Sequence, residues 1–179
     1  MAFEPRLVGT ERVAAGRVFD VEAIELEADG ERFRREVIRH KGAVAVLAVD
    51  GDEVVLVRQW RAPLATTVLE VPAGTRDVPD EDPETTARRE LEEEAGVRAE
   101  HLERLCEVWN APGWSDQRTI VFLATGLTDV PRRPSGPEEA ALEVVRVPLA
   151  DVLGTVTGPT PCDATTAVAL LALARRRSS

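Results

Sequence analysis

The chain has 179 residues and a formal net charge of −10 at pH 7, with 44% hydrophobic and 30% charged residues. This composition is typical of a globular chain with a hydrophobic core and unlike that of a disordered one. The acidic balance argues against general binding to nucleic acid or to an anionic membrane, because both partners require a basic surface.

The first third of the chain predicts two β-hairpins. Asp29-Gly30 is a strong turn dipeptide inside the partly alternating stretch 18–40. Asp50-Gly51 is a second turn, which separates the continuous apolar run 43–49 from the returning stretch 54–59. Continuous apolar runs of this length suit strands that are covered on both faces. The next stretch, VLEVPAG, predicts a short strand that ends at Pro72.

The remaining elements include two helices. Asp82 can cap a helix that begins at Pro83 and stops before Gly96. Further strands are predicted at 102–110, 118–127 and 142–148, a surface loop at 128–140, and a C-terminal helix at 163–177. We therefore expect a mixed α/β fold in which helices cover a central sheet.

Several acidic residues crowd the first helix. Ala87, Leu91 and Ala95 form an apolar stripe on it, and three carboxylates, those of Glu90, Glu93 and Glu94, share the neighbouring edge. One interpretation is a solvated acidic face with Arg88 and Arg89 as counterions. The other is a site for Mg²⁺ or Mn²⁺, because carboxylates and a carbonyl from Pro72-Ala73-Gly74 are hard oxygen ligands.

The stretch from Gly74 to Val97 resembles the Nudix box, a loop-helix-loop motif of diphosphate hydrolases. Its second half, RELEEEAGV, fits the pattern position by position. The departure lies in the loop, where six residues separate Gly74 from Glu81 and the general pattern has five. An additional loop residue leaves the helix intact.

Segments outside the box resemble the ADP-ribose pyrophosphatase branch of this family. They include VIRHKGAVAVLAV, VVLVRQWRAP and NAPGWSDQ, and Pro112 stands fifteen positions after Val97, where the branch carries a marker proline. The resemblance implies a Nudix-type α/β/α sandwich with a mixed central sheet, over residues 42–179, plus an N-terminal β-hairpin sheet. It also implies a homodimer in which residues 1–41 exchange between subunits.

Functional residues follow from the same resemblance. The metal ligands would be the Ala73 carbonyl, Glu90 and Glu94, with Glu93 sharing or supporting them. The catalytic residues would be Glu139 and Glu93. Glu139 would be the distal carboxylate that orients or deprotonates the attacking water, with Glu138 and Glu143 as alternatives. Arg89 would be structural. The resemblance also places Glu70 and Pro112 at the substrate. Independently of it, a site this acidic needs cations for an anionic substrate, so Arg58 and Arg61 are candidates to bind phosphate and Trp60 to stack on adenine, with Arg76 as a further phosphate-binding candidate. The alternative for the first three is a surface strand end with a core tryptophan.

The implied reaction is Mg²⁺-dependent hydrolysis of ADP-ribose to AMP and ribose 5-phosphate. Metals near both phosphates would lower the pKa of bound water and neutralise developing charge. One alternative is a Nudix hydrolase for another nucleoside diphosphate derivative, such as a sugar nucleotide or NADH, or for a nucleoside triphosphate. The other is a non-catalytic ADP-ribose sensor, which would carry a damaged acid cluster.

The sequence also bears on location and partners. Cys106 and Cys162 lie far apart, which argues against a disulfide framework or a thiolate zinc site, and no segment approaches the ~20 apolar residues of a membrane span. We therefore expect a cytoplasmic protein whose partner is a small-molecule substrate rather than a nucleic acid or a membrane.

Overall fold

A computed structural model describes residues 3–178, which divide into two compact units. The first unit contains residues 3–42 and 109–118, and the second contains residues 43–108 and 119–178. No sequence signal had grouped 109–118 with the N-terminal strands. The predicted domains, 1–41 and 42–179, stay a prediction, because compactness alone does not show that a segment folds independently.

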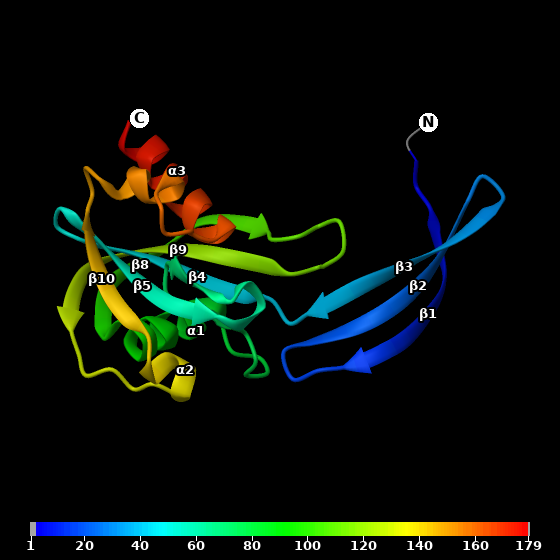
Figure 1. Cartoon of the computed structure of the whole chain (residues 1–179), viewed down its shortest axis with the longest axis horizontal. Coiled ribbons are helices and arrows are strands. Elements are labelled where there is room, and N and C mark those ends of the chain that lie inside the picture. The colour runs from blue at the N-terminus through cyan, green and yellow to red at the C-terminus, as the bar shows by residue number, and fades with distance from the viewer. Residues whose placement is uncertain (1–2, 179) are drawn as a thin grey trace. The chain divides into compact units, whose positions relative to one another are not determined.

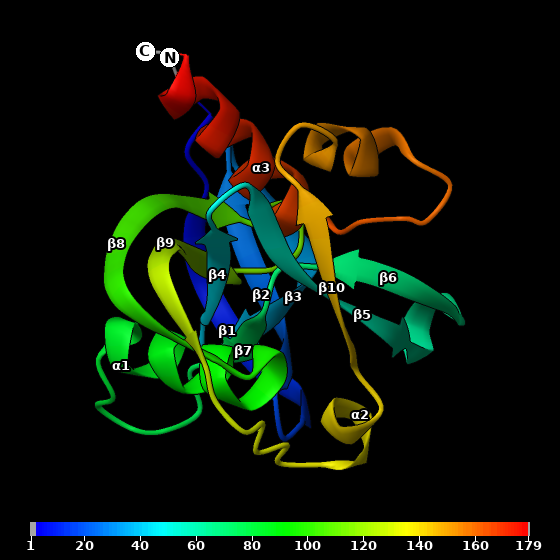
Figure 2. The ribbon, with the colours of Figure 1, turned by 90° about the vertical axis from the view of Figure 1, so that its left-hand side faces the viewer.

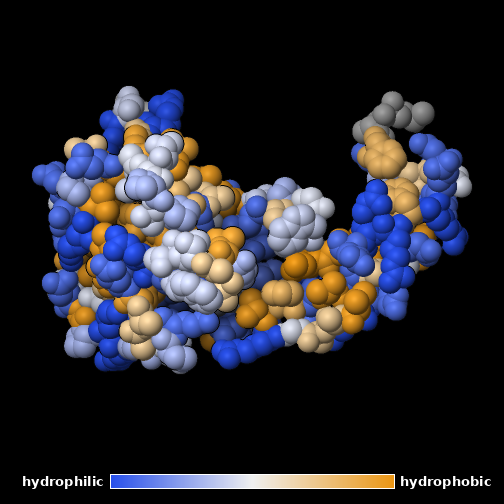
Figure 3. Space-filling view, viewed as in Figure 1, coloured by the Kyte–Doolittle hydropathy of each residue, from blue (hydrophilic) through white to orange (hydrophobic). Residues whose placement is uncertain are grey.

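The first unit is a three-stranded antiparallel sheet in the order β1-β2-β3 (Figure 1). Its strands are β1 (Arg6–Ala15), β2 (Phe19–Ala28) and β3 (Glu31–His40). The predicted turn joins β2 to β3, and Asp29 and Gly30 both have positive φ angles, 52° and 81°. Strand β1 was not predicted, because nearly all of it is exposed and it lacks a buried alternating face. Hydrophobic residues of this unit reach the surface among charged ones (Figure 3).

The second unit contains a seven-stranded mixed sheet in the order β10-β5-β4-β9-β8, with β6 paired to β5 and β7 to β4. β4 runs parallel to β9 and antiparallel to β5 and β7. The strands are β4 (Ala43–Asp50), β5 (Glu53–Arg61), β6 (Thr66–Glu70), β7 (Ala73–Thr75), β8 (Val97–Trp109), β9 (Arg118–Asp129) and β10 (Glu143–Pro148).

Helices cover both faces of this sheet (Figure 2). Val44 and Val46 of β4 pack with Leu91 on one face, whereas Ala45 and Leu47 pack with Leu170 on the other. The alternation follows from the two-residue period of a strand, and it explains why β4 reads as an unbroken apolar run. The predicted mixed α/β fold, with a central sheet between helices and a separate hairpin sheet, is confirmed.

The first helix begins and ends where the sequence predicted, but its last turn differs. α1 (Pro83–Glu90) continues into a π-helical turn, η2 (Leu91–Ala95). The Asp82 side chain accepts hydrogen bonds from the amides of Glu84 and Thr85, and Gly96 ends the helix with a φ of 65°. A π turn holds more residues than an α turn, so the acidic side chains leave the angles that a regular helix predicts.

The other helical segments are short except the last. They are η1 (Ala62–Leu64), α2 (Pro137–Ala140), η3 (Val152–Thr157) and α3 (Ala164–Arg177). α2 lies within the stretch predicted as a loop, where Pro137 occupies the first helical position. α3 confirms the predicted C-terminal helix, and Asp163 caps it. None of the helices within residues 3–178 combines the length and hydropathy needed to cross a membrane.

Candidate functional site

Two of the clustered acids are buried at the end of the first helix. Glu90 is 6% exposed and Glu94 is 5% exposed, so the predicted solvated acidic face is wrong for both. They lie against β7: the Ala73 amide donates a hydrogen bond of 2.9 Å to Glu94 Oε2. A Cβ atom added to Gly74 would stand 2.0 Å from Cδ of Glu90. Gly74 is therefore required for the close approach of strand and carboxylate.

Burial changes how readily these two carboxyl groups lose their protons. Burial raises the pKa of Glu94 to about 8, with the charges of Glu90 and Glu139 adding to the rise and the Ala73 amide opposing it. Burial also raises the pKa of Glu90 to about 7, with Glu93 and Glu139 adding and Arg89 opposing. A cation bound beside the pair would favour the ionised form of both carboxyl groups and so oppose the effect of burial.

Arg89 forms ion pairs with acidic side chains of the cluster. Its guanidinium lies 2.8 Å from Glu90 Oε1, 3.1 Å from Glu93 Oε2 and 3.4 Å from Glu81 Oε2. The predicted structural role of Arg89 agrees with these contacts. Arg88, the other predicted counterion, pairs with Glu84 at 2.8 Å instead. Glu92 points elsewhere and pairs with Arg98 at 2.7 Å.

The loop that contains the additional residue, 75–80, leaves Glu81 in contact with the first helix. Asp80 has a φ of 60°, the left-handed conformation that an aspartate tolerates in a turn. Beyond it, Glu81 accepts a hydrogen bond of 2.8 Å from the buried Thr86 hydroxyl and also contacts Arg89. Arg76 donates to the Glu81 carbonyl at 3.3 Å, so the structure ties this candidate phosphate ligand to the loop itself.

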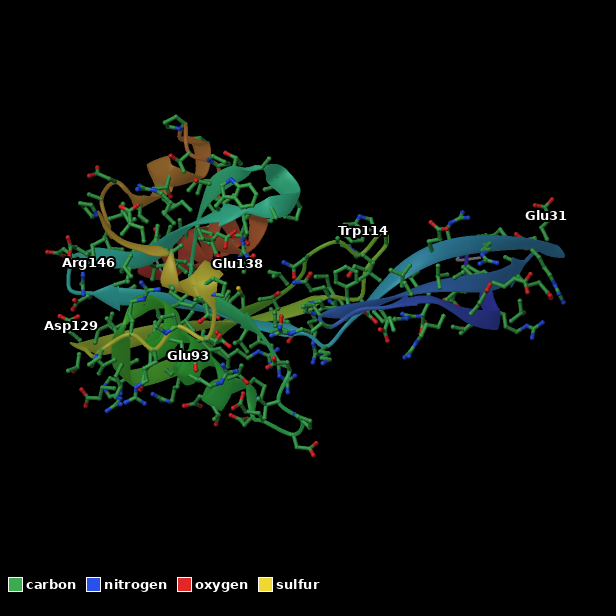
Figure 4. All side chains as sticks on the ribbon, turned by 60° about the horizontal axis from the view of Figure 1, so that its bottom comes forward. Glu31, Glu93, Trp114, Asp129, Glu138 and Arg146 are labelled. Atoms are coloured by element: carbon green, nitrogen blue, oxygen red, sulfur yellow. The ribbon has the colours of Figure 1, made fainter. Side chains whose placement is uncertain are left out.

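Of the three candidates for the distal carboxylate, the structure separates Glu139 from the others. The charge of Glu139 contributes to the raised pKa values of both Glu90 and Glu94, so it lies within electrostatic reach of them. Glu143 pairs with Arg58 at 2.8 Å. Glu138, on α2, lines a cavity on the β5 side (Figure 4).

The predicted substrate residues of β5 and β6 form a polar cluster of their own. The buried Glu70 carboxylate accepts hydrogen bonds from Gln59 Nε2 at 2.8 Å and from Arg61 Nε at 2.9 Å. Arg61 also contributes to the electrostatic environment of Glu94. Gln59 is the member that the sequence analysis missed. Gln59 and Arg61 lie two residues apart on one face of β5, but only the pairing of Val57 with Glu70 brings them to Glu70.

A cavity of about 450 Å³ adjoins this cluster. Arg58, Trp60 and Glu143 line it together with Glu138, and Trp60 is 60% exposed. A large exposed aromatic beside a cavity is available to stack on a planar ligand. Pro112 belongs to the other unit, where it lines a cavity of about 420 Å³ with Trp109 and Trp114.

The donor set at the helix end suits a hard divalent cation. It consists of carboxylate oxygens from Glu90, Glu93 and Glu94 beside the backbone of β7, and two of these acids are desolvated and close to like charge. Within residues 3–178, however, no three acidic, histidine or cysteine side chains already form a complete cation cage.

The chain is similar to known proteins over most of its length. The NUDIX domain family matches residues 38–161. The chain is 39% identical over 172 residues to the ADP-ribose pyrophosphatase of Bacillus subtilis, covering 94% of this chain and 92% of the relative. It is 33% identical to the methanol dehydrogenase activator of Bacillus methanolicus, covering 94% and 91%. A crystal structure of an ADP compounds hydrolase superposes with a TM-score of 0.87 and 26% identity, covering 99% and 97%.

Replacing Gly74 tests the approach of β7 to Glu90. Gly74→Ala should lower the free energy of unfolding by about 1–3 kcal/mol, because the new methyl group must displace the Glu90 carboxylate or the strand. Urea unfolding of metal-free protein measures this change. Gly154→Ala is the matched control, since a Cβ there meets nothing within 4 Å. Equal stability of the two variants would contradict the close contact.

The raised pKa of Glu94 predicts how stability depends on pH. A folded-state pKa of about 8 lies above the ordinary value of 4.5, so the stability that this group contributes is full below pH 4.5 and is lost as pH rises from there to about 8. Metal-free Glu94→Gln should therefore be more stable than the parent protein at pH 9, by on the order of 3 kcal/mol, and should lose that advantage near pH 5. Urea unfolding at both pH values checks the difference, and an advantage independent of pH would refute it.

Proposed function

Because this chain belongs to the Nudix hydrolase family, we propose that it hydrolyses the diphosphate bond of ADP-ribose to AMP and ribose 5-phosphate with Mg²⁺. The observation that carries the proposal is the pair of buried carboxylates, Glu90 and Glu94, beside β7 and within electrostatic reach of Glu139. The name of the Bacillus subtilis relative, an ADP-ribose pyrophosphatase, supports the choice of substrate.

We assign the cation to oxygens of Glu90, Glu94 and the Ala73 carbonyl, with Glu93 sharing or supporting it. When bound, Mg²⁺ or Mn²⁺ supplies positive charge to the diphosphate and lowers the pKa of coordinated water. The raised pKa values of Glu90 and Glu94 support this assignment, because such groups gain the most from a nearby positive charge. Arg89 limits the repulsion within the cluster by pairing with Glu90 and Glu93.

Glu139 is the proposed general base. A carboxylate near the helix acids can accept a proton from the attacking water as the water's oxygen bonds to phosphorus, while AMP or ribose 5-phosphate departs. The proton then passes from Glu139 on α2 to solvent. Glu143 is less suited to this task because it is paired with Arg58, and Glu138 because it faces the neighbouring cavity.

Substrate recognition is assigned to β5, β6 and the residues around them. Arg58 and Arg61 would contact phosphate oxygens, and Trp60 would stack on the adenine. Glu70 fixes the Arg61 guanidinium through hydrogen bonds to it, so Glu70 would act on substrate through Arg61. Pro112 is assigned to substrate recognition as well, by resemblance to the ADP-ribose pyrophosphatase branch. The same resemblance supports a cytoplasmic homodimer.

Other nucleoside diphosphate derivatives are the alternative substrates. The ADP compounds hydrolase that superposes on the chain supports ADP derivatives as a class. A sensing role without turnover is disfavoured, because the acid cluster is intact and its carboxylates converge at one helix end.

A substrate panel tests the proposed reaction. We expect AMP and ribose 5-phosphate from ADP-ribose with Mg²⁺, a lower kcat/KM with GDP-mannose, NADH and nucleoside triphosphates, and no turnover after a chelator is added. Product chromatography measures each reaction. If GDP-mannose or NADH is hydrolysed with a higher kcat/KM than ADP-ribose, that compound is the substrate instead. Turnover that survives the chelator would refute the metal dependence.

Two neighbouring glutamates test the choice of base. Glu139→Gln should lower kcat by about 10²–10³-fold, the usual contribution of a general base, because the amide cannot accept the proton. Glu138→Gln is the matched control, with the same change one residue away, and should stay within about threefold of the parent kcat. The reverse pattern in steady-state kinetics would assign the base to Glu138.

A further inference from the structure

The segment that carries Glu139 is docked onto the end of the first helix. The Val130 amide donates a hydrogen bond of 2.8 Å to the Gly96 carbonyl. A Cβ atom on Gly96 would stand 2.7 Å from Arg132 Cγ, so the Arg132 side chain packs on this glycine. The residue that ends the helix thus also fixes the start of the loop. This contact explains how a segment rich in proline and glycine keeps a defined position.

Arg132 fixes the backbone at the far end of the same loop. Its guanidinium donates hydrogen bonds to the Glu139 carbonyl at 2.5 Å and to the Leu142 carbonyl at 3.0 Å. A planar guanidinium with several donors can hold two carbonyls in a fixed relation. These bonds place the backbone of Glu139 but leave the direction of its side chain to other contacts.

Ser135 supplies those contacts. Its hydroxyl donates to Glu139 Oε1 at 2.6 Å, and its amide donates to Oε2 at 2.6 Å. Both carboxylate oxygens are therefore held by one residue, four positions earlier in the chain. Without these bonds a half-buried glutamate on the short helix α2 samples several rotamers, and each gives its carboxylate a different position.

We propose that Ser135 is a positioning residue for the reaction, whose hydroxyl and amide hold the Glu139 carboxylate in the orientation from which it activates water. This inference rests on the proposed role of Glu139 as the base. It predicts that loss of the Ser135 contacts lowers kcat and leaves substrate binding nearly unchanged, because an incorrect orientation of the base affects the chemical step. An exposed serine outside the helix-loop motif thereby acquires a role in catalysis.

Removal of the hydroxyl tests the role of Ser135. Ser135→Ala keeps the amide bond and loses the other, so kcat should fall by about tenfold while KM stays within about twofold. Ser135→Thr restores the hydroxyl and should recover most of the lost kcat. Ser178→Ala is the matched control, because it deletes an exposed hydroxyl that donates a hydrogen bond of 3.0 Å far from this loop in the chain. It should leave both constants unchanged.

The outcomes separate this inference from the function on which it rests. If Glu139→Gln abolishes turnover but Ser135→Ala leaves kcat unchanged or raises it, the positioning role is overturned and the base stands. Equal losses in Ser135→Ala and Ser135→Thr overturn it too, because they indicate a general disturbance of the loop. If Glu139→Gln itself leaves turnover unchanged, the proposed base is wrong, and the role of Ser135 is overturned with it.

Discussion

Glu90 and Glu94 are two carboxyl groups removed from water at the end of one helix, and this burial is the constraint on which the site depends. Each is almost fully covered, and each is raised in pKa chiefly by desolvation. A desolvated carboxylate must keep a proton, pair with a cation or destabilise the fold. The packing of Ala87, Leu91 and Ala95 into the sheet core stabilises the helix that imposes this arrangement.

Positive charge in this part of the molecule is already engaged. Arg89 pairs with Glu90 and Glu93, Arg61 with Glu70, and Arg58 with Glu143. In a chain with a net charge of −10, a diphosphate would meet arginines whose charge is largely offset. A divalent cation held by the helix acids, as proposed, would reverse the local sign, and this would give a physical reason for burying carboxylates there. The contact with Glu70 fixes the guanidinium of Arg61, and the pair adds no net charge.

Local chemistry made much of the fold predictable. The turn at Asp29-Gly30, the cap at Asp82 and the stop at Gly96 depend on backbone conformations that a few residue types favour, so they could be read from short stretches. Strand β1 escaped prediction because nearly all of it is exposed, and hydrophobic alternation appears only where one face is buried. The π-helical turn η2 left no sequence signal.

The sequence by itself determined the main strands and the two long helical segments of the second unit, the family and the identity of the clustered acids, because each depends on residue types at fixed spacing. Only the tertiary structure decided which acids are buried, since that depends on the approach of Gly74 in β7 to a helix that follows it in the chain. It also decided that Glu139 lies close enough for its charge to raise the pKa values of Glu90 and Glu94, and that Ser135 holds the Glu139 carboxylate. These relations join residues from separate elements, and no local pattern encodes the packing that brings them together.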